Sequence, residues 1–308
     1  NPKPSLIDFN HDGLIDLLLG DTEGRLGYFR NTGTPEQPHF VPVTERLGNV
    51  DIATWHVFAD IDNDNDLDLF CDSRTGGIAF YRNDGGPDSL PVFTMVNAAY
   101  AGIETGVNST PAFVDLDNDG DLDFFFGAVS GALEFYRNDG TPAIPLFSLV
   151  DNFYDQILAF PGGGKAALDP HHGFSAIYFG DLDNDNDLDL FWGDIFNTNL
   201  YYFENDGSAA VSALTWVTET YLLEPTKGFN HPRLADLDND GDLDMILGVA
   251  NAADLNNLPL LRNLGTPDQP FFTTETTSLL SMIEVGSFSQ PALGDLDHDG
   301  DLDLLIGG

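Results

Sequence analysis

The sequence predicts an all-β fold, a β-propeller of four-stranded blades, and three observations support this prediction. A nine-residue acidic segment occurs six times, with its first aspartate at positions 8, 60, 115, 181, 236 and 295. Successive copies are 52 to 66 residues apart, a period typical of repeat architectures. Short apolar runs and Gly-rich turns surround each copy, and none of these runs shows helical periodicity.

The third repeat shows the expected order of strands within one blade. PAFVDL (111–116) leads into the acidic segment, and DFFFGAV (123–129) leads out of it. GALEFYRN (131–138) is the third expected strand, and the fourth follows the turn in DGTPAIPLFSLV. Four strands per repeat without helices are typical of a propeller blade.

We expect a single propeller domain over residues 1–308. Its repeat units are expected at about 1–48, 49–101, 102–160, 161–223, 224–282 and, incomplete, 283–308. The last unit contains only its first two strands, so six blades are expected, or seven with residues outside this chain. Because two strands alone leave an open edge, we expect the missing strands to come from sequence beyond residue 308 or from a neighbouring chain.

The acidic segments, called loops 1 to 6 below, have the composition of calcium-binding loops. Oxygen-bearing side chains occupy positions 1, 3, 5 and 9, and Gly or Asn occupies position 6, where a positive φ is expected. So many carboxylates would repel one another without a cation, and Ca²⁺ accepts about six to eight oxygen ligands in adaptable geometry. An EF-hand is excluded because the glutamate that it needs at position 12 is missing.

Each loop is therefore predicted to bind one Ca²⁺, up to six in all, through side chains at positions 1, 3, 5 and 9 and the backbone carbonyl at position 7. The predicted ligands are Asp8, Asn10, Asp12, Leu14 and Asp16 in loop 1; Asp60, Asp62, Asp64, Asp66 and Asp68 in loop 2; Asp115, Asp117, Asp119, Asp121 and Asp123 in loop 3; Asp181, Asp183, Asp185, Asp187 and Asp189 in loop 4; Asp236, Asp238, Asp240, Asp242 and Asp244 in loop 5; and Asp295, Asp297, Asp299, Asp301 and Asp303 in loop 6.

These motifs resemble the FG-GAP/VCBS repeat family, which includes the propellers of integrin α-subunits. The similarity rests on repeated D-x-D-x-D-G-x-x-D loops with F-x-x-G and Y-F-R-N-T-G-T flanks, and it extends over essentially the whole chain. It implies a calcium loop between the first two strands of each blade, and it does not specify a biological role. Loop 1 departs from the pattern at Asn10 and Leu14, so we expect it to bind calcium more weakly.

The composition excludes some classes of partner. The net charge is −40, and the six loops hold 28 of the 51 acidic residues, so nucleic acid is not an expected partner. No apolar run reaches the length of a membrane span. Cys71 is the only cysteine, so no internal disulfide is possible, and we expect it to be buried. Low-affinity calcium sites fill at extracellular calcium concentrations, which favours an extracellular or cell-surface location.

Three features outside the loops invite a functional interpretation. Arg30, Arg82, Arg137 and Arg262 follow the apolar core of the third expected strands, and we expect them to pair with acids of the same or a neighbouring blade. Residues 151–175 form an insertion with His171 and His172, where a propeller could carry a recognition loop. PGGGK (161–165) lacks the frame of a P-loop, and Asn108 begins a glycosylation sequon.

The sequence favours a secreted or cell-surface module that binds an extracellular protein or glycan, or joins neighbouring copies in a surface assembly, without catalysis. No catalytic residues are predicted. The alternative is an extracellular carbohydrate-active enzyme of the polysaccharide lyase or sugar dehydratase type. Such an enzyme needs a cluster of catalytic side chains, whereas the candidates are scattered along the chain: His56, Lys165, His171, His172 and Arg233.

Overall fold

The computed structural model of the chain describes residues 3–21, 23–34, 37–53, 55–73, 77–85, 90–103, 110–116, 118–127, 133–141, 144–151, 176–193, 198–207, 213–218, 220–226, 228, 230–238, 240–249, 258–266, 269–277, 279, 290–296, 300 and 302–307. The chain divides into two compact units, which are described separately. Unit 1 comprises residues 1–108 and 290–308, and unit 2 comprises residues 109–289.

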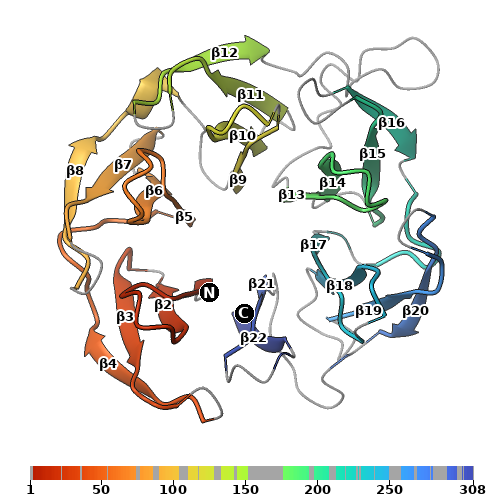
Figure 1. Ribbon diagram of the computed structural model, residues 1–308, viewed down its shortest axis with the longest axis horizontal. Helices are drawn as coiled ribbons and strands as arrows, with labels where there is room; N and C mark the ends of the chain where they lie inside the picture. Colours follow the sequence, from red (N-terminus) through yellow and green to blue (C-terminus); the bar gives the residue numbers. More distant parts are fainter. Residues whose placement is uncertain are drawn as a thin grey trace. The chain divides into compact units, whose positions relative to one another are not determined.

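Unit 1 contains two four-stranded sheets and one two-stranded sheet (Figure 1). Blade 1 has β1 (Lys3–Ile7), β2 (Asp16–Gly20), β3 (Leu26–Asn31) and β4 (Phe40–Thr44), and blade 2 has β5 (His56–Ala59), β6 (Asp68–Asp72), β7 (Ile78–Asn83) and β8 (Phe93–Asn97). A 3-10 turn, η1 (Tyr100–Gly102), follows β8, and the two-stranded sheet pairs β21 (Gln290–Gly294) with β22 (Asp303–Gly307).

Unit 2 contains three four-stranded sheets, blades 3, 4 and 5. Their strands are β9 (Thr110–Val114), β10 (Asp123–Gly127), β11 (Leu133–Asn138) and β12 (Phe147–Asp151); β13 (Ala176–Gly180), β14 (Asp189–Gly193), β15 (Tyr201–Asn205) and β16 (Leu214–Thr218); and β17 (His231–Ala235), β18 (Asp244–Gly248), β19 (Leu260–Asn263) and β20 (Phe272–Thr276).

The fold is an all-β propeller of four-stranded antiparallel blades, as the sequence predicts: five blades and a partial sixth sheet. Within each blade the strands are hydrogen-bonded in chain order, and each acidic loop joins the first strand to the second. The expected strands of the third repeat agree with β9 to β12 to within two residues at every described end.

In blades 2 to 5 the second strand forms the core because both of its faces are covered. Every residue of β6, β10, β14 and β18 is buried, which explains why these segments are almost continuously apolar. The fourth strands lie at the free edge of each blade, and β4 and β8 are largely exposed. Cys71 is completely buried in β6, which confirms the expectation for this residue.

Aromatic side chains fill the space between neighbouring blades within each unit. In unit 1, Phe9 contacts Phe58 with ring centroids 5.4 Å apart, which joins blades 1 and 2. In unit 2, Phe125 of blade 3 lies 4.9 Å from Phe179 of blade 4. These edge-to-face and tilted contacts suit the quadrupoles of the rings and bury a large apolar area.

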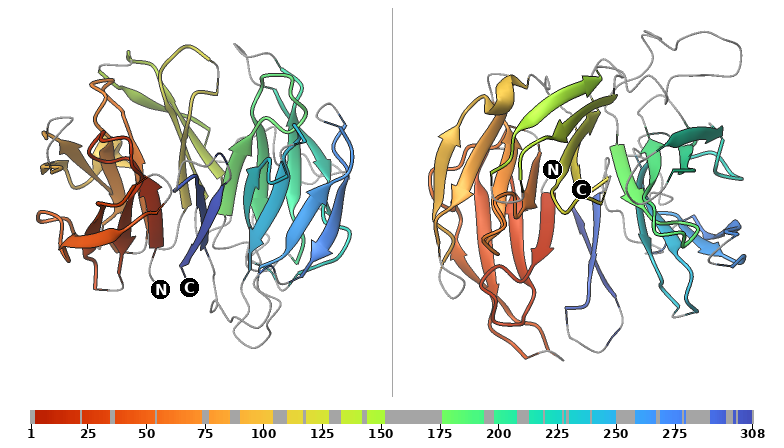
Figure 2. Two further views of the ribbon diagram at one scale, coloured as in Figure 1. Left: turned by 60° about the horizontal axis from the view of Figure 1, so that its bottom comes forward. Right: turned by 45° about the horizontal axis from the view of Figure 1, so that its top comes forward.

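The partial sixth sheet packs against blade 1. In this contact Gly294 of β21 faces Leu6 and Ile15, whose side-chain atoms would lie 3.4 to 3.7 Å from a Cβ at position 294. The pair β21–β22 is antiparallel (Figure 2). Within the described residues, no helix has the length and apolarity needed to cross a membrane.

Gly193, at the end of β14, provides a test of the packing between blades 4 and 5. A Cβ at this position would lie 1.8 Å from the backbone carbonyl oxygen of Asn230, and backbone cannot move aside as a side chain can. We therefore expect Gly193→Ala to lower the free energy of unfolding by about 3 kcal/mol or more, which would be measured as a lowered melting temperature. The control is Gly294→Ala, where the closest atom would be 3.4 Å away, and it should melt close to wild type.

Candidate functional site

The acidic loops share one backbone conformation. Position 6 has a positive φ wherever the structure describes it, with 86° at Gly13 and 70° at Asn65, as the sequence predicts. Position 4 is also left-handed, with φ between 52° and 61° at His11, Asn63, Asn118 and Asn184. Two left-handed residues separated by one residue curl the chain tightly, and Gly and Asn accept this conformation at low cost.

Hydrogen bonds from the loop backbone hold the first carboxylate in place. In loop 2, the Oδ1 and Oδ2 atoms of Asp60 accept from the backbone N–H groups of Asp64 and Asn65 at 3.1 and 3.0 Å. Asp64 in turn accepts from the N–H of Asp66 at 2.9 Å. Loops 1, 3, 4 and 5 contain the same three bonds, so the conformation follows from the loop sequence itself.

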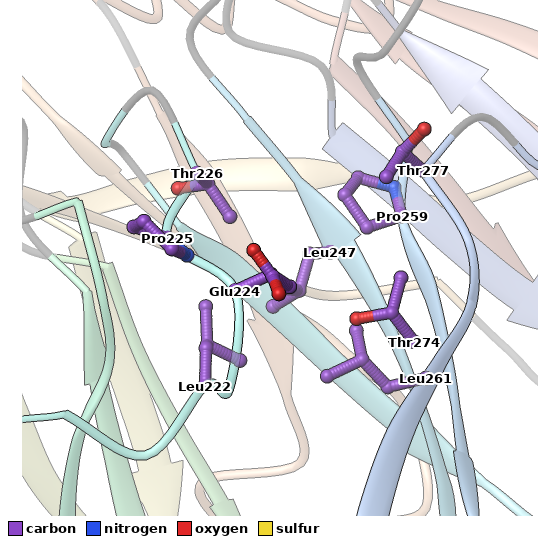
Figure 3. A pocket seen from close by; sticks show the side chains of 9 residues that line it. All are labelled: Leu222, Glu224, Pro225, Thr226, Leu247, Pro259, Leu261, Thr274 and Thr277. Carbon is purple, nitrogen blue, oxygen red and sulfur yellow. The ribbon is translucent and has the colours of Figure 1, made fainter.

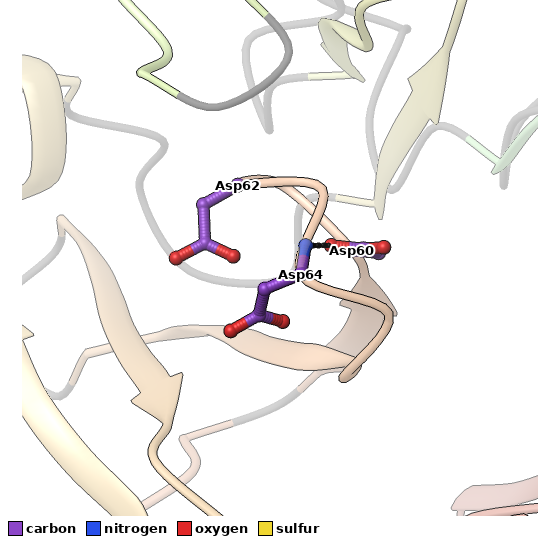
Figure 4. A group of neighbouring side chains, drawn as sticks. All are labelled: Asp60, Asp62 and Asp64. Carbon is purple, nitrogen blue, oxygen red and sulfur yellow. Dashed lines mark hydrogen bonds between the residues drawn. The ribbon is translucent and has the colours of Figure 1, made fainter. Parts of the chain in front are cut away.

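This conformation brings the carboxylates of positions 1, 3 and 5 together. In three loops the oxygens of these residues lie within 4.8 Å of one another: Asp60, Asp62 and Asp64; Asp181, Asp183 and Asp185; Asp236, Asp238 and Asp240. Figure 4 shows the group of loop 2, whose three side chains come from one turn of the chain. Each group could hold a metal ion, and carboxylate oxygens are the ligands that hard divalent cations prefer.

The groups are electrostatically unfavourable on their own. Two carboxylates at this separation repel each other by roughly 1 kcal/mol in bulk water and by about 3–4 kcal/mol at an effective dielectric constant near 20. Burial raises the pKa of Asp62 and Asp183 above the usual range of an aspartate, and the neighbouring carboxylates of the same loop raise it further. A bound cation would convert this repulsion into attraction.

Several buried carboxylate oxygens fit such a cation. The Oδ1 atoms of Asp62 and Asp183, both at position 3, are buried and have no hydrogen-bond partner among the described residues. The same is true of Asp242 Oδ1 at position 7 and Asp295 Oδ1 at position 1. Buried acceptors without donors are costly, so the donor set of these loops suits a cation that would satisfy them.

The aspartate at position 9 makes a different set of contacts. This residue is not a member of the three carboxylate groups. In loops 1, 2 and 4 it is completely buried, as Asp16, Asp68 and Asp189. Its Oδ1 accepts from the backbone N–H of the asparagine that ends the third strand, at 2.8 Å from Asn83 to Asp68 and 2.9 Å from Asn205 to Asp189. Burial raises the pKa of Asp68 and Asp189 to about 7, although these N–H donors lower it.

The same asparagine closes the turn between the third and fourth strands. In blade 4, Asn205 Oδ1 accepts from the N–H groups of Gly207 at 3.3 Å and Ala213 at 2.7 Å. Equivalent pairs of bonds occur at Asn31, Asn83, Asn138 and Asn263. Each asparagine therefore connects the acidic loop to the turn of its blade.

The four arginines near the ends of the third strands pair with acids of their own blades, as expected, but in two different ways. Arg82 contacts Asp84 at 2.6 Å and Arg137 contacts Asp139 at 2.7 Å, both outside the acidic loops. Arg30 instead contacts Asp12 of loop 1 at 2.9 Å.

In blade 5, Arg262 lies 3.6 Å from Asp238 and also contacts Asp244 and Glu275. Loop 1 and loop 5 thus already have a guanidinium beside a predicted metal ligand. An arginine in this place competes with a metal for the carboxylate, so these two loops should bind a cation more weakly than loops 2 and 4.

Some predicted site residues lie outside the described residues. These are Asp117 of loop 3 and Asp297, Asp299 and Asp301 of loop 6. The insertion from 152 to 175, with Lys165, His171 and His172, and the sequon residue Asn108 also lie outside them.

A separate pocket lies in unit 2, between blade 5 and the chain that connects β16 to β17. Its cavity measures about 130 Å³ and is lined by Leu222, Glu224, Pro225, Thr226, Leu247, Pro259, Leu261, Thr274 and Thr277. The three leucines and Pro259 are buried and form an apolar floor, whereas Glu224 and Thr277 are exposed at the rim. Figure 3 shows the Glu224 carboxylate between the two walls of the pocket.

Comparison with known families identifies the repeat. The FG-GAP-like repeat matches residues 8–71, 115–192 and 181–247, which together make up more than half of the chain. The chain belongs to the FG-GAP-like repeat family. The matched segments begin at the first aspartates of loops 1, 3 and 4, so the acidic loop and its flanking strands carry the similarity.

Two solved structures share the fold of this FG-GAP-like repeat protein. A lectin of Agrocybe aegerita, described as specifically recognising non-reducing terminal N-acetylglucosamine, is 17% identical with a TM-score of 0.54, over 99% of this chain and 74% of the lectin. The Tc holotoxin pore of Photorhabdus luminescens is 19% identical with a TM-score of 0.53, over 98% of this chain and 13% of the toxin chain. At these identities the similarity shows the fold alone. No curated protein sequence matches this chain.

Sequence reasoning missed two features of the FG-GAP-like repeats. The left-handed residue at position 4 had a signal, because all six copies carry Asn or His there, residue types that accept this conformation. The second role of position 9, as the acceptor for the third strand, could have been suspected from the asparagine that ends the third strand in five repeats. The pocket had no signal, since its walls come from five separate segments of the chain.

The asparagine contacts predict a structural role that is independent of any metal. Asn205→Ala should leave the N–H groups of Gly207 and Ala213, in a partly buried turn, without this acceptor, at a cost of about 1–3 kcal/mol in total. The melting temperature should fall equally with and without a chelator. Asn97→Ala removes a single exposed bond to the N–H of Ala99 and should have little effect. A loss of stability that occurred only with calcium present would contradict the structural role of Asn205.

Proposed function

We propose that this chain is a calcium-stabilised propeller that acts outside the cell as a non-catalytic module for binding a glycan. The observation that carries the proposal is the pocket of unit 2, an apolar floor with one exposed carboxylate at its rim. The acidic loops support the calcium part of the proposal through their grouped carboxylates and their buried oxygens without donors.

Calcium is the cation that best fits the loops. Each group consists only of carboxylates on an irregular turn, and Ca²⁺ accepts such oxygen ligands in varied geometry, whereas Mg²⁺ requires near-ideal octahedral sites. When bound, calcium would neutralise the loop carboxylates and so stabilise the folded state. Extracellular calcium is high enough to fill sites of modest affinity, which supports a location outside the cell.

The pocket has the chemistry for a small neutral sugar. Leu222, Leu247 and Leu261 offer an apolar surface to the C–H face or to an acetyl methyl group. The Glu224 carboxylate can accept hydrogen bonds from hydroxyl or amide N–H groups. A cavity of 130 Å³ is close to the roughly 150 Å³ that accommodates benzene in a protein core, so it suits one ring or acyl group of a larger glycan.

The comparison with the lectin suggests a first ligand to test. An N-acetylated hexosamine could place its methyl group on the leucine floor and its N–H toward Glu224. The pocket lining contains a single ionisable side chain, Glu224, and no nucleophile paired with a base. A binding role therefore agrees better with this pocket than a catalytic one.

The calcium proposal is tested by chelation and by a change in one loop. Removal of calcium should lower the melting temperature markedly, because each site filled to 100 times its Kd contributes about 2.7 kcal/mol. Asp183→Asn should remove one of the tighter steps from a calcium titration, since it changes a carboxylate of loop 4. Asp206→Asn, an exposed acid outside the loops of the same blade, should leave the titration unchanged.

The weakest steps of the calcium titration should belong to loops 1 and 5, where an arginine already contacts the loop carboxylates. A melting temperature that is insensitive to chelation would exclude the proposed stabilisation by calcium.

The glycan proposal is tested with N-acetylglucosamine and a glycan array, in the presence of calcium. Thr274→Trp should fill the pocket and weaken sugar binding at least tenfold, and Glu224→Gln should weaken it by a smaller factor because one acceptor is lost. Glu45→Gln changes an exposed acid of unit 1 and should bind as wild type. Equal binding by wild type and Thr274→Trp would show that the pocket is not the sugar site.

A further inference from the structure

Arg233 of β17 is a cation in unit 2 without an acidic partner among the described residues. Its Nη1 donates to the backbone carbonyl of Pro232 at 2.9 Å, and its Cζ lies 5.3 Å from the ring centroid of Tyr178 on β13. The side chain is half-buried, and burial lowers the pKa of Arg233 below its ordinary value. The ring supports the guanidinium through a cation–π contact, which leaves the Nε and Nη2 donors for another group.

The other arginines of the described residues are neutralised or solvated. Five of them lie against carboxylates: Arg25, Arg30, Arg82, Arg137 and Arg262. Arg46 is exposed to water. In a chain with 51 acidic and 11 basic residues, an arginine that lacks a carboxylate is unexpected. Among the described residues, Arg233 therefore differs from the five paired arginines in lacking a carboxylate, and from Arg46 in being half-buried.

The blade does not need a charged residue at this place. Arg233 stands three residues before the first aspartate of its loop, and the equivalent residues of the other first strands are uncharged: Ser5, Val57, Ala112, Tyr178 and Ala292. A partly desolvated cation without a counter-ion is unfavourable for folding. The arrangement is therefore better explained by a ligand than by the packing of the blade.

We propose that Arg233, supported by Tyr178, binds the carboxylate of an acidic sugar, such as a uronate unit. The proposal rests on the proposed function in taking the ligand to be a glycan. The planar guanidinium can donate two parallel hydrogen bonds to a carboxylate through its Nε–Nη2 edge. The net charge of −40 repels anions at long range, so binding would require this local pairing and would select ligands that match it.

The test compares methyl β-D-glucuronoside with methyl β-D-glucoside, which differ only in the carboxylate. With calcium present and at about 0.15 M salt, where the Debye length is about 8 Å, wild type should bind the glucuronoside more tightly. Arg233→Met should weaken glucuronoside binding by about 10-fold to 100-fold, the effect expected for a charge-assisted pair. Arg233→Lys should retain part of the affinity because lysine keeps the positive charge. It should lose the remainder because an ammonium group lacks the planar pair of donors of the guanidinium.

Two controls separate a ligand role from a structural one. Arg137→Met removes an arginine that is paired with Asp139 in blade 3, and it should not change glucuronoside binding. Arg233→Met should melt at or above the temperature of wild type, since it removes a cation without a counter-ion, whereas a structural role would lower the melting temperature.

The outcomes distinguish this inference from the proposed pocket. If wild type binds both glycosides equally, or if Arg233→Met binds the glucuronoside like wild type, the carboxylate site is refuted, and binding of N-acetylglucosamine at the pocket is unaffected by that result. If the glucuronoside binds in an Arg233-dependent manner while Thr274→Trp has no effect on neutral sugars, the carboxylate site stands and the pocket fails. Binding of no sugar at all would refute both.

Discussion

In each of the five blades, the hydrogen bond between the ninth residue of the acidic loop and the end of the third strand is the contact on which the blade depends. It is 2.7 Å long between Asn31 and Asp16 in blade 1, and both partners are buried. On one side it fixes the end of a loop rich in negative charge. On the other side it fixes an asparagine whose side chain closes the next turn. One buried carboxylate thereby fixes the position of the acidic loop relative to the third and fourth strands of the blade.

This contact also explains how a chain of such charge can fold around its own acids. The loop carboxylates divide into two groups: those at positions 1, 3 and 5 gather near the surface, and the one at position 9 accepts a backbone N–H bond through its Oδ1 inside the blade. Backbone N–H groups bind the second group whether or not a metal is present. A cation would satisfy the carboxylate oxygens that have no donor among the described residues, at positions 1, 3 and 7 and at Asp68 Oδ2 in position 9.

Much of the fold and of the loop geometry could be predicted from the sequence, because the same residue pattern occurs six times. The position of each loop, the four-strand order and the left-handed residue at position 6 follow from local residue preferences. The carboxylate of Asp189 could not be assigned fully, because its partners Leu182 and Asn205 become visible only when strands are paired. The pocket and the contact of Arg233 with Tyr178 depend on packing between blades, which no local preference encodes.

The local character of the blades has a consequence for how the chain acquires its structure. Every pairing inside a blade joins neighbouring strands, and the bond from Asn138 to Asp123 spans only 15 residues, so a blade can form soon after its own segment leaves the ribosome. The contact of Gly294 with Leu6 is different, because it joins the two ends of the chain. Closing so long a loop carries a large entropic cost, so blade 1 must wait, with one flank exposed, until β21 and β22 have been synthesised.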